Sequence, residues 1–166
     1  MVEPWLRGTR TEVDALRRQV LHALELASED VARWCSGLSD AAMHERPYGV
    51  ASVAFHLRHM VRSLDRLLTY AEGGQLSAAQ MAQLGTEMEP AGTAAVVLEE
   101  FRAGLAAALV RIGDISPGSF EEACGVGRGR LPSTVGGLLV HCAEHTQRHL
   151  GQAITTAQIV LKILPD

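Results

Sequence analysis

The stretch that decides the fold runs from Thr134 to Ile163 and reads TVGGLLVHCAEHTQRHLGQAITTAQIVLKI. Apolar side chains recur along it at steps of three and four residues, among them Leu138, Cys142 and Val160, which places them on one side of a helix. A helix of this length buries such a side by packing against other helices. The stretch therefore predicts a long bundle helix over residues 134–163.

Three further stretches repeat this periodicity. A Thr9-x-x-Glu12 pattern, typical of a helix-capping box, precedes the first of them. Ser52 is the expected cap of the second, and Gly113 ends the third. No segment shows the convincing alternation of a β-strand. These three stretches predict helices over residues 10–36, 53–72 and 93–112. With residues 134–163 they make four predicted helices.

Four amphipathic helices in a chain of 166 residues bury their apolar sides by packing on one another. The expected fold is therefore all-α: a four-helix bundle with long connections, forming a single domain over residues 1–166. The connections 73–92 and 113–133 exceed the usual two to eight residues of bundle loops. Either these connections serve function, or Leu76 to Leu84 forms a short packing helix and the glycine-rich 113–133 segment is a plain crossover.

Charge and composition exclude several classes of function. With 15 basic and 19 acidic residues the net charge is −4, and no basic run suits a nucleic acid. Apolar runs such as Leu105 to Val110 are far shorter than the roughly 20 residues that cross a bilayer, and no secretion signal is evident. Cysteines 35, 124 and 142 lack the spacing of a disulfide framework or thiolate zinc site. We expect a cytoplasmic protein with free thiols and a small-molecule substrate, without a nucleic-acid or membrane partner.

The chemistry lies in histidines of the long helix. His145 and His149 are one turn apart on the apolar side, so both rings can reach one ion at about 2.0–2.1 Å. Gln152 lies a further turn along the same side. A catalytic site of the zinc type needs three protein ligands and an open position, so a third ligand must come from another helix. His141, one turn before His145, is an alternative ligand, although three successive turns are too spread along the axis to meet one ion comfortably.

Residues 53–72 supply the candidates for the third ligand. His56 and His59 both lie on a flank of the apolar side, and position alone favours His56, which projects nearer its centre. His22 lies off the apolar line of its helix and His44 falls in a polar connection. Both are expected to be solvated surface residues.

At these residues the sequence resembles the DinB/YfiT-like family of bacterial four-helix-bundle metalloproteins. The family's site draws one histidine from the second helix and two from the last. The resemblance therefore implies His59, His145 and His149 as metal ligands, overriding the positional preference for His56. The shared motifs are an H-x-x-x-H-x-G-Q ending, here His145, His149, Gly151 and Gln152, and an S-V-x-x-x-x-x-H opening, here Ser52, Val53 and His59.

The resemblance also implies a class of activity. Family members bind zinc or nickel, often as homodimers, and some are metal-dependent transferases of low-molecular-weight thiols or a thiol-dependent isomerase. The expected function is that of a metal-dependent thiol S-transferase or related hydrolase. The alternative is a non-catalytic metal- or ligand-binding stress-response bundle protein. No Glu-x-x-His pair supports a di-iron site, and no HExxH motif suggests a metalloprotease.

Other polar residues are candidates for supporting roles. Glu144, Arg148 and Gln152 are placed to orient ligands or substrate from behind the metal ligands. Arg128 and Arg130, in the glycine-rich connection, are candidates to meet an anionic cofactor at the rim of the site.

Overall fold

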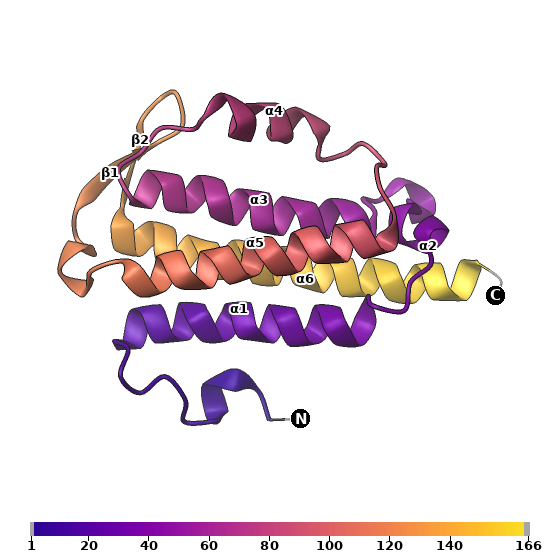
Figure 1. The fold of residues 1–166 in the computed structure, drawn as a ribbon, viewed down its shortest axis with the longest axis horizontal. Helices are drawn as coiled ribbons and strands as arrows, with labels where there is room; N and C mark the ends of the chain where they lie inside the picture. The colour runs from indigo at the N-terminus through magenta and orange to yellow at the C-terminus, as the bar shows by residue number, and fades with distance from the viewer. Residues whose placement is uncertain (1, 165–166) are drawn as a thin grey trace.

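Four long helices lie side by side in the computed structural model, which describes residues 2–164 (Figure 1). The helix α6 contacts α1 and α3, and α3 in turn contacts α5. The predicted all-α bundle is therefore confirmed. Its long helices are α1 (Ala15–Trp34), α3 (Val53–Ala71), α5 (Ala94–Asp114) and α6 (Val135–Ile163).

Side-chain caps set where these helices begin. Ser52 accepts the backbone N–H three residues ahead at 3.2 Å, as the sequence predicts, and Thr134 does the same at 3.1 Å. The prediction for the first helix is wrong by several residues, because α1 begins at Ala15 rather than at residue 10. Its cap is Asp14, whose carboxylate accepts the N–H of Arg17 at 3.1 Å. The Thr9-x-x-Glu12 pattern lies outside the helix.

Short elements join the long helices. The helix α4 (Ala78–Thr86) lies along the outer side of α3 and corresponds to the short helix expected from Leu76 to Leu84 (Figure 1). None of its residues is fully buried, so it covers α3 without entering the core. The remaining short pieces are α2 (Asp40–His44) and three 3₁₀ turns, η1 (Pro4–Leu6), η2 (Pro47–Gly49) and η3 (Pro117–Ser119).

The glycine-rich connection holds a small β-hairpin, which the sequence analysis did not predict. Strands β1 (Ala123–Val126) and β2 (Leu131–Thr134) pair antiparallel. Gly127 follows β1 with a φ of 70°, a left-handed conformation that glycine adopts without steric cost and that lets the chain reverse. Each strand has only four residues, too few to give a clear alternating pattern.

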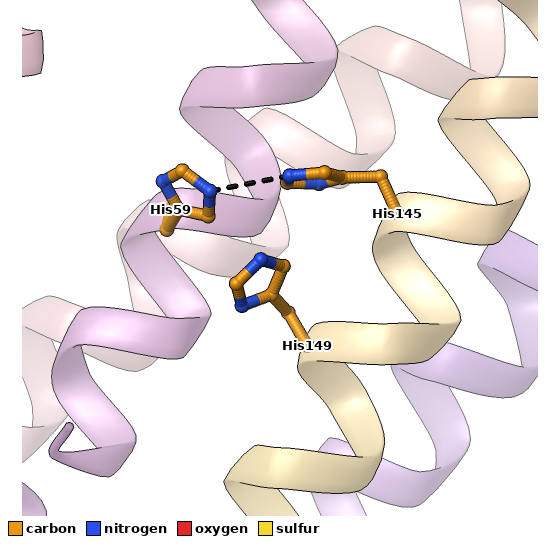
Figure 2. A group of neighbouring side chains, drawn as sticks. All are labelled: His59, His145 and His149. Atoms are coloured by element: carbon orange, nitrogen blue, oxygen red, sulfur yellow. Dashed lines mark hydrogen bonds between the residues drawn. The ribbon is translucent and has the colours of Figure 1, made fainter. Parts of the chain in front are cut away.

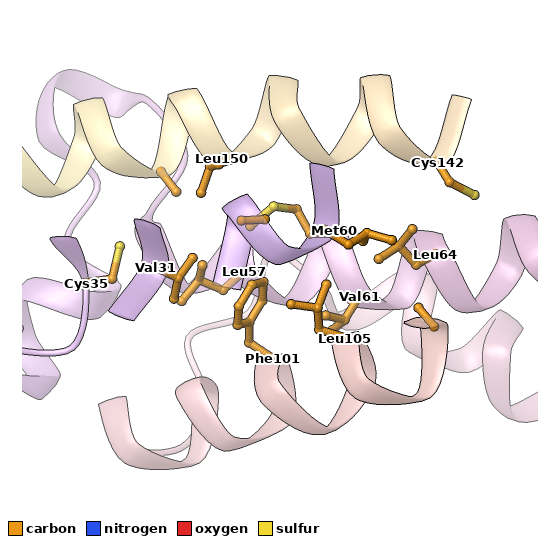
Figure 3. Close-up of a cluster of buried hydrophobic side chains, with 14 of the residues drawn as sticks. Val31, Cys35, Leu57, Met60, Val61, Leu64, Phe101, Leu105, Cys142 and Leu150 are labelled. Atoms are coloured by element: carbon orange, nitrogen blue, oxygen red, sulfur yellow. The ribbon is translucent and has the colours of Figure 1, made fainter. Parts of the chain in front are cut away.

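The core lies between the four long helices (Figure 3). Phe101 from α5 and Leu57 and Met60 from α3 are at most 1% exposed, and burial of each such side chain is worth about 1.5–3 kcal/mol. All three cysteines are free. Burial raises the pKa of Cys35 to about 11 and that of Cys142 to about 12, so both thiols stay protonated at neutral pH and serve as packing residues. Within residues 2–164, every helix is too short or too polar to span a membrane.

We expect Gly104→Ala to destabilise the bundle, because α5 passes close to α3 at this residue. A Cβ at Gly104 would lie 2.6 Å from the Cβ of Val61. Alanine favours a helix over glycine by about 1 kcal/mol, but crowding a packed core costs about 1–3 kcal/mol. The free energy of unfolding, measured by urea denaturation, should fall by about 1 kcal/mol. Gly113→Ala, where an added Cβ has no neighbour within 4 Å, is the matched control and should not destabilise. Equal effects of the two substitutions would contradict the close contact.

Candidate metal centre

Three histidines converge between α3 and α6 (Figure 2). His59 comes from α3, and His145 and His149 come from successive turns of α6. One ring nitrogen of each lies within 4.8 Å of those of the other two. The Nε2 atoms of His59 and His145 are 3.2 Å apart, and nitrogens bound tetrahedrally to one ion at 2.0–2.1 Å would be about 3.3 Å apart. The group has the dimensions of a metal coordination sphere.

Phe55 helps to hold the ring of His59. It lies one turn earlier on α3, and its ring stacks on that of His59 with centroids 5.2 Å apart and an angle of 13° between the planes. The ring centroid of His149 is 4.5 Å from those of both His59 and His145. The three imidazoles therefore pack as one cluster against an aromatic side chain.

A buried carboxylate orients His59, and the sequence analysis missed it. Nδ1 of His59 donates to Oε2 of Glu87 at 2.6 Å, while Arg66 donates to Oε1 of the same carboxylate at 2.7 Å. With Nδ1 of His59 bound to the carboxylate, the other ring nitrogen, Nε2, faces Nε2 of His145. Carboxylates commonly orient metal-binding imidazoles in this way. Glu87 follows α4 in the long 73–92 connection, where no spacing relates it to the histidines.

Glu87 stays ionised although it is only 5% exposed. Burial alone would raise the pKa of its carboxyl, but hydrogen bonds from His59 and Arg66 and the charge of Arg66 bring that pKa below its usual value. A negative charge therefore lies directly behind His59 at neutral pH, where it would stabilise positive charge on the far side of the ring.

His56 contacts the cluster but is not part of it. It is 5% exposed, and its Nδ1 lies 3.1 Å from Nδ1 of His149. One hydrogen lies between the two Nδ1 atoms. When His149 donates it, Nε2 of the neutral His149 ring has no hydrogen and is free for an ion. Position on the helix favours His56 over His59. The structure instead brings His59 together with His145 and His149.

The other histidines lie outside the group. His141 is next to His145 on α6, with its Nδ1 3.3 Å from the carboxylate of Glu144. His44 is half-buried and donates from Nε2 to a backbone carbonyl at 2.8 Å. The prediction that His22 is solvated is wrong, since it is 3% exposed. The segment before α1 folds back over it, and Thr9 Oγ1 lies 3.2 Å from its Nε2.

The predicted supporting residues are all exposed. Gln152 lies at the surface instead of on the buried side of α6, and Glu144 and Arg148 are also exposed. Arg128 and Arg130 follow β1 in the hairpin turn, and neither lines a cavity beside the histidines.

Two cavities lie beside the histidine cluster. One, of about 220 Å³, is lined by Ser63, His141 and His145, with Leu76 and Leu84 of the α4 region on its outer side. The other, of about 580 Å³, is lined by residues that include His56 and Arg148. A third cavity of about 460 Å³, between the end of α5 and the hairpin, is lined by none of the histidines.

The ring nitrogens are suited to a divalent ion. Burial, followed by repulsion from neighbouring rings, lowers the pKa of His56, His145 and His149 to about 4. All three are therefore neutral at pH 7, which is the form that binds metals. The spacing of the ring nitrogens of His59, His145 and His149, together with the carboxylate behind His59, fits one ion with imidazole ligands.

We expect the metal-free protein to lose stability as the pH falls from 6.5 towards 4. The three lowered pKa values, about 4 in the fold against 6.5 ordinarily, mean that the unfolded chain binds more protons across this range. Because His145 and His149 are half exposed, solvent screens part of the effect, and the three together should contribute a loss on the order of 2 kcal/mol. Urea denaturation at several pH values measures it. A His145→Asn/His149→Asn double variant should show a flatter dependence, and an unchanged one would contradict the shifts.

The fold and the site together define a four-helix bundle with a three-histidine centre that fits a metal ion. The sequence profile of the DinB superfamily matches residues 9–153, which is most of the chain. The chain belongs to the DinB superfamily. No curated protein sequence matches it.

Proposed function

We propose that the protein is a metal-dependent thiol S-transferase with zinc or nickel held by His59, His145 and His149. The observation that carries this proposal is the convergence of three ring nitrogens from two helices, with one Nε2–Nε2 distance of 3.2 Å. Three protein ligands leave a position open for a reactant, as in catalytic sites of the zinc type. Burial raises the pKa of Cys35, Cys142 and Cys124, and Cys124 lines the cavity near the hairpin, away from the histidines, so the sulfur would come from a small molecule.

A divalent ion bound to neutral ligands lowers the pKa of a thiol or water at its open position, which makes a nucleophile near neutral pH. The chain's own residues prepare that site. Glu87 binds Nδ1 of His59, which leaves Nε2 facing His145, and His56 binds Nδ1 of His149. Ser63 Oγ, 3.5 Å from Nε2 of His59, is a hydroxyl placed to hydrogen-bond a group bound beside the ring.

Two cavities beside the cluster support transfer over hydrolysis. A transferase brings two organic molecules together, whereas a hydrolase binds one and uses water. The cavity under α4, lined by Ser63 and His145, would take the thiol, and the larger cavity lined by His56 would take the acceptor. A new carbon–sulfur bond forms as a carbon–halogen or carbon–oxygen bond breaks and its electron pair goes to the halogen or the oxygen. The thiol proton passes to solvent or, with an epoxide, to that oxygen.

The test starts with the metal content of the purified protein. The protein loaded with zinc or nickel is then mixed with glutathione, cysteine or coenzyme A and with an aryl halide or an epoxide. We expect thiol consumption that requires the metal. The metal content should be retained in His141→Ala, a variant of a neighbouring histidine outside the group. Ester hydrolysis without a thiol would favour the hydrolase. Bound metal without turnover in any assay would favour the non-catalytic binding protein.

A further inference from the structure

The larger cavity beside the histidines has a cation and no acid in its wall. It measures about 580 Å³ and lies between the segment at Val50 and the part of α6 from Arg148 to Ile159. Among residues 2–164, no aspartate or glutamate lines it. By contrast, the cavity near the hairpin is lined by Glu72, Asp114 and Glu122, whose charges would oppose an anion. Within residues 2–164 the smaller cavity under α4 also lacks an acid in its wall, but its arginine, Arg66, binds Glu87. The cavity at Arg148 is therefore suited to a negatively charged ligand.

Arg148 has no partner within the part of the chain that the structure describes. Its guanidinium makes neither a hydrogen bond nor an ion pair there, whereas Arg58, Arg66 and Arg111 each bind a carboxylate. A guanidinium offers up to five N–H donors in a planar arrangement that matches a carboxylate. The donors of Arg148 are thus available to a ligand in the cavity.

His56 supplies a second donor to the same cavity, a step that rests on the proposed metal site. If Nε2 of His149 binds the ion, its Nδ1 keeps the hydrogen and donates to Nδ1 of His56 at 3.1 Å. The neutral ring of His56 then carries its own hydrogen on Nε2. That atom makes no hydrogen bond among residues 2–164 and is not one of the fully buried unpaired atoms. Because His56 lines the cavity, we assign Nε2 as its donor there.

We propose that this cavity binds a small organic carboxylate. The carboxylate oxygens accept hydrogen bonds from Arg148 and from Nε2 of His56, and the apolar body of the ligand packs against Val50 and Ile159. The positive charge of Arg148 and the two donors set the orientation of the carboxylate, and aliphatic side chains line part of the remaining cavity. The acceptor of the proposed transferase would accordingly be an organic acid. It would be bound beside His56, which contacts the metal ligand His149.

The probe for this site is hexanoate, with uncharged hexanamide as its match in shape. Both are titrated into zinc-loaded and metal-free protein, and the backbone amide signals are followed by NMR. We expect hexanoate to shift the signal of Gly151, which lines the cavity, and to bind about tenfold more tightly than hexanamide. Zinc should strengthen binding by fixing the hydrogen on Nε2 of His56.

Matched variants locate the carboxylate. Arg148→Met should weaken hexanoate about tenfold and remove its advantage over hexanamide. Arg102→Met, at an exposed arginine of α5, should leave binding unchanged. His56→Gln keeps an N–H donor and should retain more affinity than His56→Leu.

Binding that is unaffected by Arg148→Met and absent without zinc would place the carboxylate on the ion and overturn the proposal. Shifts confined to the cavity at Arg111 and Cys124 would also overturn it. The result is separable from the proposed function, because hexanoate can bind through Arg148 even if no thiol is ever transferred. Conversely, if the protein transfers thiols but hexanoate does not shift the Gly151 signal, the proposed function holds and the carboxylate site is wrong.

Discussion

Replacing His149 with alanine is expected to lower the affinity for zinc by more than about a hundredfold, beyond the usual effect of changing a group behind a metal ligand. The substitution removes one of three nitrogens and breaks the chelating pair that His145 and His149 form on one face of α6. It also leaves Nδ1 of His56 without its partner. Competition with a chromogenic chelator measures the affinity.

The matched control is His141→Ala, which removes the same side chain one turn before His145. His141 lies outside the group, so this variant should bind zinc as the parent protein does. Circular dichroism should show an intact bundle for both variants, because both side chains are at least partly exposed. If His141→Ala loses zinc and His149→Ala keeps it, the ligand assignment is wrong.

Thermal unfolding gives a second readout of the same substitution. A ligand that binds only the folded state stabilises it by RT ln(1 + [L]/Kd), about 2.7 kcal/mol at a hundredfold excess over Kd. Zinc should therefore raise the Tm of the parent protein and of His141→Ala. It should leave the Tm of His149→Ala nearly unchanged at the same zinc concentration.

The bundle was predictable because its signal is repeated many times. Each long helix spans several turns, so its apolar side is marked by many residues at the helical period, and caps such as Ser52 and Thr134 mark their starts. The hairpin was not predictable, because four residues per strand carry little periodicity. His22 shows a related gap: position on α1 alone does not reveal that the preceding segment folds back over the helix.

The candidate site was predictable only in part, for the same physical reason. His145 and His149 are neighbours along one helix, so helix geometry alone pairs them. The choice between His56 and His59 depends on how α3 is rotated against α6, which spacing within one helix does not define. Glu87 reaches His59 only through the path of a long connection. A residue brought in by a loop leaves no periodic trace in the sequence.

Replacing Glu87 with glutamine is expected to weaken zinc binding by about tenfold to a hundredfold while the bundle still folds. The amide oxygen can still accept from Nδ1 of His59, but it brings no negative charge to balance the ion. The amide N–H₂ would then meet the guanidinium of Arg66, a contact between two donors. Since Arg66 is only 9% exposed, the free energy of unfolding should also fall by about 1–3 kcal/mol.

Glu100→Gln separates these two effects. Glu100 accepts from Arg58 at 3.0 Å and from Arg62 at 2.7 Å, and it contacts no histidine. Arg58 is 5% exposed, so Glu100→Gln should cost stability much as Glu87→Gln does. Its zinc affinity should remain that of the parent protein, because the charge it loses does not lie behind a metal ligand. Equal zinc affinities in the two variants would mean that Glu87 contributes only by binding Arg66. The orientation of His59 would then be set by Phe55 and by the packing of α3 on α6.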